Sequence, residues 1–172
     1  MKPLLGKIAS FRRLPAFAKL WFLPVWVILG VAKAVIFIVP FKHVCGWLGT
    51  HEGIAARSLL LDPSQEARAR AVGRVVRLTA PYAPWNANCF PQAIAARLLL
   101  GLYGVPQLIY FGLIHDPSTR ELKAHAWVTA GRVAVTGGHC FANYTVVGIF
   151  ASKGRDRDRR RSIQGVATAR TS

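Results

Sequence analysis

The chain has 172 residues, 52% of them hydrophobic and 17% charged, so it can form one domain with a core and is not a disordered chain. It carries 23 Lys and Arg against 7 Asp and Glu, and this net charge of +16 favours polyanionic partners such as acidic peptides, anionic lipid headgroups or nucleic acid. Three cysteines, Cys45, Cys89 and Cys140, are an odd number without CxxC spacing, which predicts a reducing compartment without a disulfide framework. Because no small-residue cleavage site closely follows the first apolar stretch, we expect a cytoplasmic protein.

The most apolar part of the chain lies near its start, at residues 14–41. It is long enough to cross a bilayer, for which about 20 apolar residues suffice. Lys19, Pro24 and Lys33 interrupt it, however, and a lysine at the bilayer centre costs roughly 3 kcal/mol. We therefore expect residues 1–53 to form an apolar N-terminal helical segment, with one or two helices that pack on the fold or lie peripherally on the inner face of a membrane. A true membrane span is the alternative.

Two helices are predicted in the middle of the chain. Over residues 63–79 the apolar residues recur at helical spacing, with Ser64 as the expected N-cap and an inward face made of Ala67, Ala71, Val75 and Leu78. Residues 82–88 (YAPWNAN) are typical of a loop. A second helix is predicted over residues 89–103, because Gly104 and Pro106 provide its stop.

Beyond this helix the periodicity changes to that of β-strands. Four segments are rich in β-forming residues, with a turn expected at 116–123; the predicted strands are residues 107–115, 124–130, 132–136 and 144–150. Helices followed by a meander of strands predict an α+β domain over residues 54–150, with helices packed on a small antiparallel sheet. Residues 151–172 are basic and poor in large apolar groups, so we expect a disordered tail.

Cys89 and His125 are the candidate catalytic residues. Cys89 follows Asn88, which can cap, and precedes Pro91, so it falls where a loop turns into a helix. The positive end of a helix stabilises a thiolate, and its amides can hold an oxyanion, although a lone cysteine is more often simply buried. A thiol nucleophile also needs an imidazole to accept its proton, and His125 lies on a predicted strand between Ala124 and Ala126.

Three motifs, NCFPQAIAARLLLGLYGVP, AHAWV and GRVAVTGG, resemble the C-terminal domain of lasso-peptide biosynthesis B proteins in their split form. The resemblance covers roughly residues 55–150 and extends loosely to PFK at 40–42. It implies a transglutaminase-like, papain-related fold with Cys89 as nucleophile and His125 as base and then acid. It also implies a precursor peptide as substrate, a separate leader-binding recognition protein and a macrolactam-forming cyclase as partners, and no cofactor, with any ATP requirement of the maturation system left open.

The sequence departs from this family at the third catalytic position. The family usually places an Asp about a dozen residues after the histidine, but residues 135–144 read VTGGHCFANY, and no carboxylate occurs between Glu121 and Asp156. Three alternatives follow. The enzyme works with a dyad; Asn143 or a backbone carbonyl orients the ring, as the amide does in a Cys-His-Asn arrangement; or the chain is a degenerate member.

Other functions are less well supported by the sequence. His43, Cys45, His139 and Cys140 could ligate zinc, but their spacing matches no finger or ribbon and adjacent ligands strain tetrahedral geometry, so we expect no metal. The basic run at 155–161 lacks interleaved aromatic residues, so no specific nucleic acid is expected. A non-catalytic, membrane-associated basic protein with a degenerate peptidase fold is the alternative function.

Overall fold

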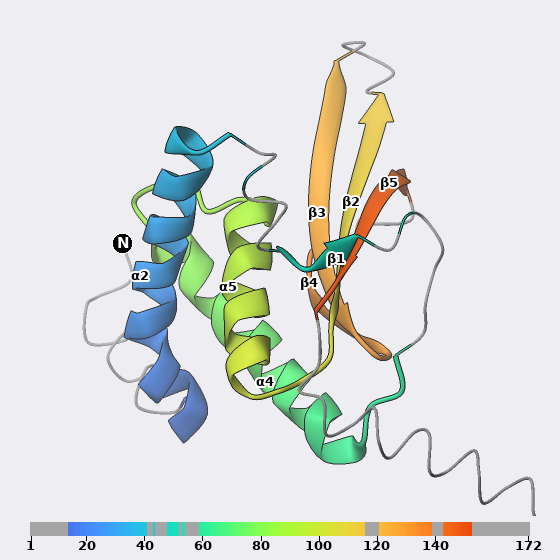
Figure 1. Ribbon diagram of the computed structural model, residues 1–172. Coiled ribbons are helices and arrows are strands. Elements are labelled where there is room, and N and C mark those ends of the chain that lie inside the picture. The colour runs from blue at the N-terminus through green and yellow to red at the C-terminus, as the bar shows by residue number, and fades with distance from the viewer. Residues whose placement is uncertain are drawn as a thin grey trace, which may run out of the picture.

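The structure is an α+β fold in which three helices cover one side of an antiparallel sheet (Figure 1). This computed structural model describes residues 14–40, 43, 48–51, 53, 59–115, 121–138 and 143–152. The long helices among these residues are α2 (Ala16–Ile38), α4 (Pro63–Thr79) and α5 (Cys89–Leu102), and a 3₁₀ turn, η1 (Ala80–Tyr82), follows α4. Helix α5 lies between α2 and the sheet (Figure 1), so its apolar residues have partners on both sides. The expected fold class is thus confirmed.

The sheet has five strands in the order β1-β5-β2-β3-β4, and every neighbouring pair is antiparallel. The strands are β1 (Thr50–His51), β2 (Leu108–His115), β3 (Leu122–Ala130), β4 (Val133–Thr136) and β5 (Thr145–Ala151). The four longer strands fall within two residues of where the sequence predicts them; β3 begins inside the predicted turn, because Leu122 and Lys123 pair with the end of β2. Strand β1 falls within residues 1–53, where we expect a helical segment, and a strand of two residues is too short to show a period of two.

Helix α4 has the predicted bounds, but its cap lies two residues before the expected Ser64. The carboxylate of Asp62 accepts a hydrogen bond from the Gln65 backbone N–H at 2.9 Å, and the Gln65 side chain accepts one from the Asp62 N–H at 3.1 Å. Ser64 instead donates its hydroxyl to Asp62 at 2.6 Å. Asp and Ser cap about equally well, and Pro63 decides between them because proline favours the first helical position.

The buried face of α4 also differs from the predicted one. Ala67 is exposed, Ala71 and Leu78 are half-buried, and the residues that face the interior are Ala69, Val72, Gly73, Val75, Val76 and Thr79. Gly73 explains the rotation, since a Cβ atom there would lie 2.6 Å from the Val135 carbonyl oxygen of β4. The helix therefore turns its glycine toward the sheet, which a count of apolar spacing alone does not reveal.

The core lies between the helices and one face of the sheet. Helix α5 presents mainly small residues there, and the fully buried set on this helix is Ala93, Ala95, Ala96, Leu99 and Leu100. Small side chains let α5 approach β3 and α4 closely. The helix ends at Leu102, one residue before the predicted end, and Gly104, with a φ of 67°, reverses the chain as predicted.

Residues 14–41 contain one continuous helix, α2, despite Pro24. Its inner face packs on α4 and α5, and two indole N–H groups fix it: Trp21 donates to the Tyr103 hydroxyl at 2.7 Å, and Trp26 donates to the Tyr82 carbonyl at 3.1 Å. By length and composition α2 could cross a bilayer, but core helices and signal sequences share that property. The predicted tail beyond residue 152 lies outside the described residues, as does the 116–120 part of the predicted turn.

We predict that Leu99→Ala lowers the free energy of unfolding by about 2–5 kcal/mol, because it leaves a cavity at a fully buried position between α5 and its neighbours. Leu98→Ala on the exposed side of the same helix is the matched control and should cost less than about 0.5 kcal/mol. Urea denaturation followed by far-UV circular dichroism measures both. Equal losses for the two variants would contradict this placement of α5.

Candidate active site

Cys89 is the first residue of α5, so its side chain leaves the backbone at the positive end of the helix dipole. It is a half-buried free thiol. Asn88 occupies the N-cap position, as predicted, but its side chain makes no capping hydrogen bond. Pro91 gives part of the reason. It occupies the third helical position, where the backbone N–H often donates to the capping side chain, and proline has no N–H. The loop before Cys89 is held instead by Gln92, whose amide donates to the Ala87 carbonyl at 2.7 Å.

His125 lies in the middle of β3, and its imidazole lies near two aromatic rings. The ring centroids of Trp127 and Tyr144 lie 5.8 and 5.0 Å from that of His125. Gly112, directly opposite His125 in the β2–β3 register, makes room for them. A Cβ atom at Gly112 would lie 2.8 Å from Tyr144 and 2.9 Å from Trp127. The imidazole is therefore half-buried among rings that limit its rotation.

A backbone carbonyl binds the His125 ring. The Nε2 atom lies 3.1 Å from the carbonyl oxygen of Gly137, which follows β4 and has a φ of 67°. A carbonyl oxygen can only accept a hydrogen bond, so Nε2 must carry the proton. In the neutral ring Nδ1 then holds the lone pair, which is the form that a general base needs. Gly137 is 12 residues after His125, where the lasso-peptide family usually places its aspartate.

Cys89 and His125 line the same cavity, which has a volume of about 540 Å³. Its walls come from α2, α5, β2, β3 and β5, and most of them are apolar; beside the pair, they are Ile36, Asn88, Phe90, Phe111, Gly112, Leu113, Ala124, Ala126 and Val147. This volume lies within the range of about 300–1,000 Å³ that is typical of ligand pockets. Cys89 at a helix start and His125 on a strand, 36 residues apart in sequence, thus line one concave site.

The other predicted polar residues do not join this site in the part of the chain that the structure describes. Asn143 is exposed and makes no hydrogen bond to His125, so the backbone carbonyl takes the orienting role among the alternatives. Of the four potential zinc ligands, Cys45, His139 and Cys140 lie outside the described residues. Among the described ones, no group of three or more His, Cys, Asp or Glu side chains could hold a metal ion.

Sequence reasoning did not identify Gly137, Tyr144 or Gly112 as parts of the site. A carbonyl belongs to every residue, so its role leaves no signature of residue type. The available signal is the Gly137–Gly138 pair directly after a predicted strand, which is typical of a chain that needs an unusual backbone angle. Gly112 carries a comparable signal, an isolated glycine within a strand, where close approach of other groups is common.

Comparison with known proteins places this geometry in a family. A model described as the transglutaminase-like superfamily matches residues 35–148. The chain belongs to the transglutaminase-like superfamily. The matched region contains Cys89, His125 and Gly137, and the superfamily includes cysteine peptidases and transglutaminases. Searches of curated proteins and of solved structures found no match.

We predict that neutral His125 carries its proton on Nε2, because the Gly137 carbonyl accepts a hydrogen bond from that atom. Two-dimensional ¹⁵N–¹H correlation of the imidazole nitrogens, recorded above the pH at which the ring is protonated, measures the tautomer directly. The exposed His43 serves as an internal reference. A ring found with its proton on Nδ1 would contradict the proposed orientation.

We also predict that Gly137→Ala slows alkylation of the Cys89 thiol by iodoacetamide at pH 7 by about tenfold or more, a part of the roughly 10²–10⁴-fold that a positioned base contributes. The added Cβ atom would lie 3.0 Å from His125 Nε2 and 2.9 Å from the Ala126 carbonyl, at a φ that favours glycine. Gly53→Ala is the matched control, since it has a φ of 72° but nothing within 4 Å of the added atom. If both variants react at the wild-type rate, the carbonyl has no orienting role.

Proposed function

We propose that this member of the transglutaminase-like superfamily is a cysteine peptidase that removes the leader peptide from a ribosomally made precursor during lasso-peptide maturation. The observation that carries the proposal is the shared cavity of Cys89 and His125, with the imidazole held in the tautomer of a base. The resemblance of the motifs around both residues to lasso-peptide B proteins supplies the substrate class.

The proposed reaction gives each of these groups a role. Nδ1 of His125 takes the proton from the Cys89 thiol, and the resulting thiolate attacks the carbonyl carbon of the scissile bond. Backbone amides at the start of α5 stabilise the negative oxygen of the tetrahedral intermediate. The imidazolium then protonates the departing amine, which leaves as the core peptide, and the leader remains as a thioester. Finally His125 deprotonates a water molecule that attacks the thioester, and the thiolate departs and regains the proton.

Two features of the site support catalysis over a degenerate, non-catalytic fold. The hydrogen bond from Nε2–H to the Gly137 carbonyl limits the orientations of the ring and leaves Nδ1 as the acceptor that a general base requires. A thiol at a helix start whose N-cap side chain is not engaged likewise leaves that end available to a negative oxygen. The bound imidazole loses rotational freedom, and the helix start lacks a capping hydrogen bond. Both arrangements suit the proposed reaction.

The substrate and partners are proposed on the same basis. The apolar walls formed by Ile36, Phe90, Phe111, Leu113 and Val147 suit an apolar side chain beside the scissile bond. The net charge of +16 favours an acidic peptide during encounter. A separate leader-binding protein would present the precursor, and a cyclase would close the released amine into a macrolactam. All of these steps are proposed to occur in the cytoplasm.

We predict that Cys89→Ala abolishes leader cleavage, with a loss of at least about 1,000-fold, and that His125→Ala loses a comparable factor because nucleophile and base act as a unit. Incubation with a cognate precursor and its leader-binding partner, followed by mass spectrometry of the products, measures cleavage. Cys140→Ala and Cys45→Ala control for the loss of a thiol. Cleavage by Cys89→Ala at the wild-type rate would refute the proposal, and transfer to an added amine in place of water would assign transglutaminase activity.

A further inference from the structure

The outward side of α2 is apolar from one end of the helix to the other. We call this surface the outer stripe; its residues recur every three or four positions, are all exposed, and are Ala16, Leu20, Leu23, Pro24, Val27, Val31, Ala34 and Ile38. Leu20 and Leu23 are 70% and 66% exposed, and Ile38 is 77% exposed. A helix on the surface of a soluble protein normally turns polar side chains outward, whereas this stripe contains none. An apolar surface of this length indicates a partner.

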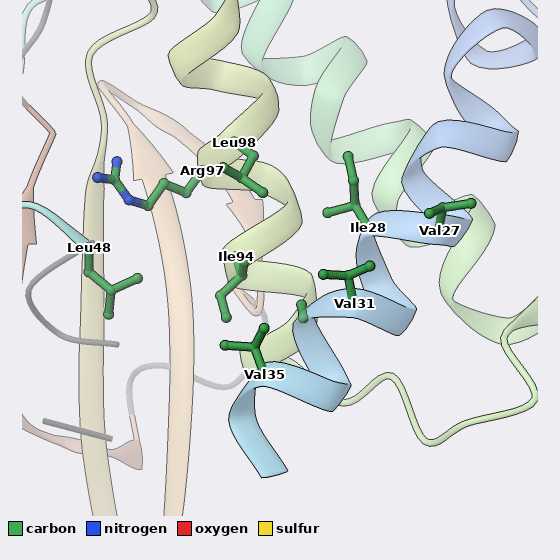
Figure 2. A pocket seen from close by; sticks show the side chains of 9 residues that line it. Val27, Ile28, Val31, Val35, Leu48, Ile94, Arg97 and Leu98 are labelled. Atoms are coloured by element: carbon green, nitrogen blue, oxygen red, sulfur yellow. The ribbon is translucent and has the colours of Figure 1, made fainter. Parts of the chain in front are cut away.

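The outer stripe continues onto the neighbouring helix. A groove of about 240 Å³ runs between α2 and α5, and eight of its nine lining residues are apolar. Figure 2 shows Val31 and Val35 of α2 facing Ile94 of α5 across it, with Leu98 at its side. Leu98 is itself 53% exposed. The apolar surface is therefore wider than a single helix, and a partner can contact α2 and α5 together.

The contacts of the inner face argue against α2 crossing a membrane. Trp21 and Trp26 hydrogen bond to Tyr103 and Tyr82, outside α2, and the Arg68 guanidinium of α4 lies 4.5 Å from the ring centroid of Tyr103. Helix α4, packed beside α2, also exposes the guanidinium-bearing residues Arg68, Arg70, Arg74 and Arg77. These arginines cannot enter hydrocarbon at reasonable cost, so α2 could span a bilayer only by leaving its neighbours.

The charges near the outer stripe indicate which kind of partner surface can bind it. The first 51 residues contain no Asp or Glu and seven basic residues, Lys2, Lys7, Arg12, Arg13, Lys19, Lys33 and Lys42. On α2, Lys19 is exposed and lies one position before Leu20 of the outer stripe. An apolar stripe flanked by cations, with no acidic residue nearby in sequence, matches an anionic bilayer surface, whose headgroups attract the cations while the acyl boundary receives the apolar side chains.

We propose that the outer stripe of α2, together with Leu98, docks this protein flat on an anionic lipid bilayer without spanning it. Ile36 belongs to the same helix and lines the cavity that holds Cys89 and His125. Docking through α2 therefore keeps the candidate active site next to the membrane surface. The docking rests on the apolar stripe and the charges alone, so it stands whether or not the proposed peptidase activity is found.

Co-sedimentation of the full chain with lipid vesicles tests the proposal. The wild type should bind vesicles of phosphatidylcholine with 30% phosphatidylglycerol, lose most binding in 0.5 M NaCl, and bind pure phosphatidylcholine at least tenfold more weakly. Leu20→Glu/Leu23→Glu should weaken binding to anionic vesicles at least tenfold, since it places two negative charges on the outer stripe. Leu60→Glu/Leu122→Glu changes charge equally at two leucines that are also exposed but lie outside α2, and should retain most binding.

Three results would overturn the proposal. The first is equal vesicle binding by wild type and Leu20→Glu/Leu23→Glu. The second is resistance of the vesicle-bound protein to extraction at pH 11 in carbonate, which would indicate a span. The third is a dimer in lipid-free solution, seen by light scattering and abolished by the same double substitution, which would assign the stripe to a second copy of the chain. Circular dichroism establishes that both variants remain folded.

Discussion

The packing of α5 between α2 and the sheet is the constraint on which the rest of this structure depends. Three of its six buried residues are alanines, so the helix axis approaches β3 more closely than longer side chains would allow. That approach decides where the helix begins relative to the strand, and it brings Cys89 to the cavity that His125 lines. The site is thus built by a layer of small side chains that take no part in the chemistry.

The walls of the same cavity come from strands and from helix α2. Strand β2 contributes Gly112, where two aromatic rings need space, and the register of β2 with β5 shifts between Phe111 and Gly112. Such irregularities re-aim side chains at the places where strands meet a site. Helix α2 adds Ile36 from the opposite layer. The candidate active site and the apolar N-terminal helix are consequently one structural unit, although they lie in separate segments of the sequence.

Much of the fold followed from the sequence because its signals are local. The stop at Gly104, the change from helical to alternating periodicity, and the position of Cys89 at a helix start each depend on a few neighbouring residues. The details that sequence did not reveal depend on contacts between distant segments. Gly73 turns α4 because the Val135 carbonyl lies against it, and β1 exists only because β5 supplies its hydrogen bonds. Motifs predict the Cys89–His125 pair, whereas the shared cavity depends on how distant segments pack.

The carbonyl of Gly137 has a consequence for how the histidine behaves and how this site diversifies. An aspartate in that role would take up a proton in acid and release the ring, whereas an amide oxygen does not titrate in that range, so the imidazole keeps its orientation as the medium acidifies. The group is also chemically identical in all twenty residue types. A substitution can therefore remove this carbonyl from the ring only by changing the backbone conformation. A search for polar side chains alone would not find the carbonyl.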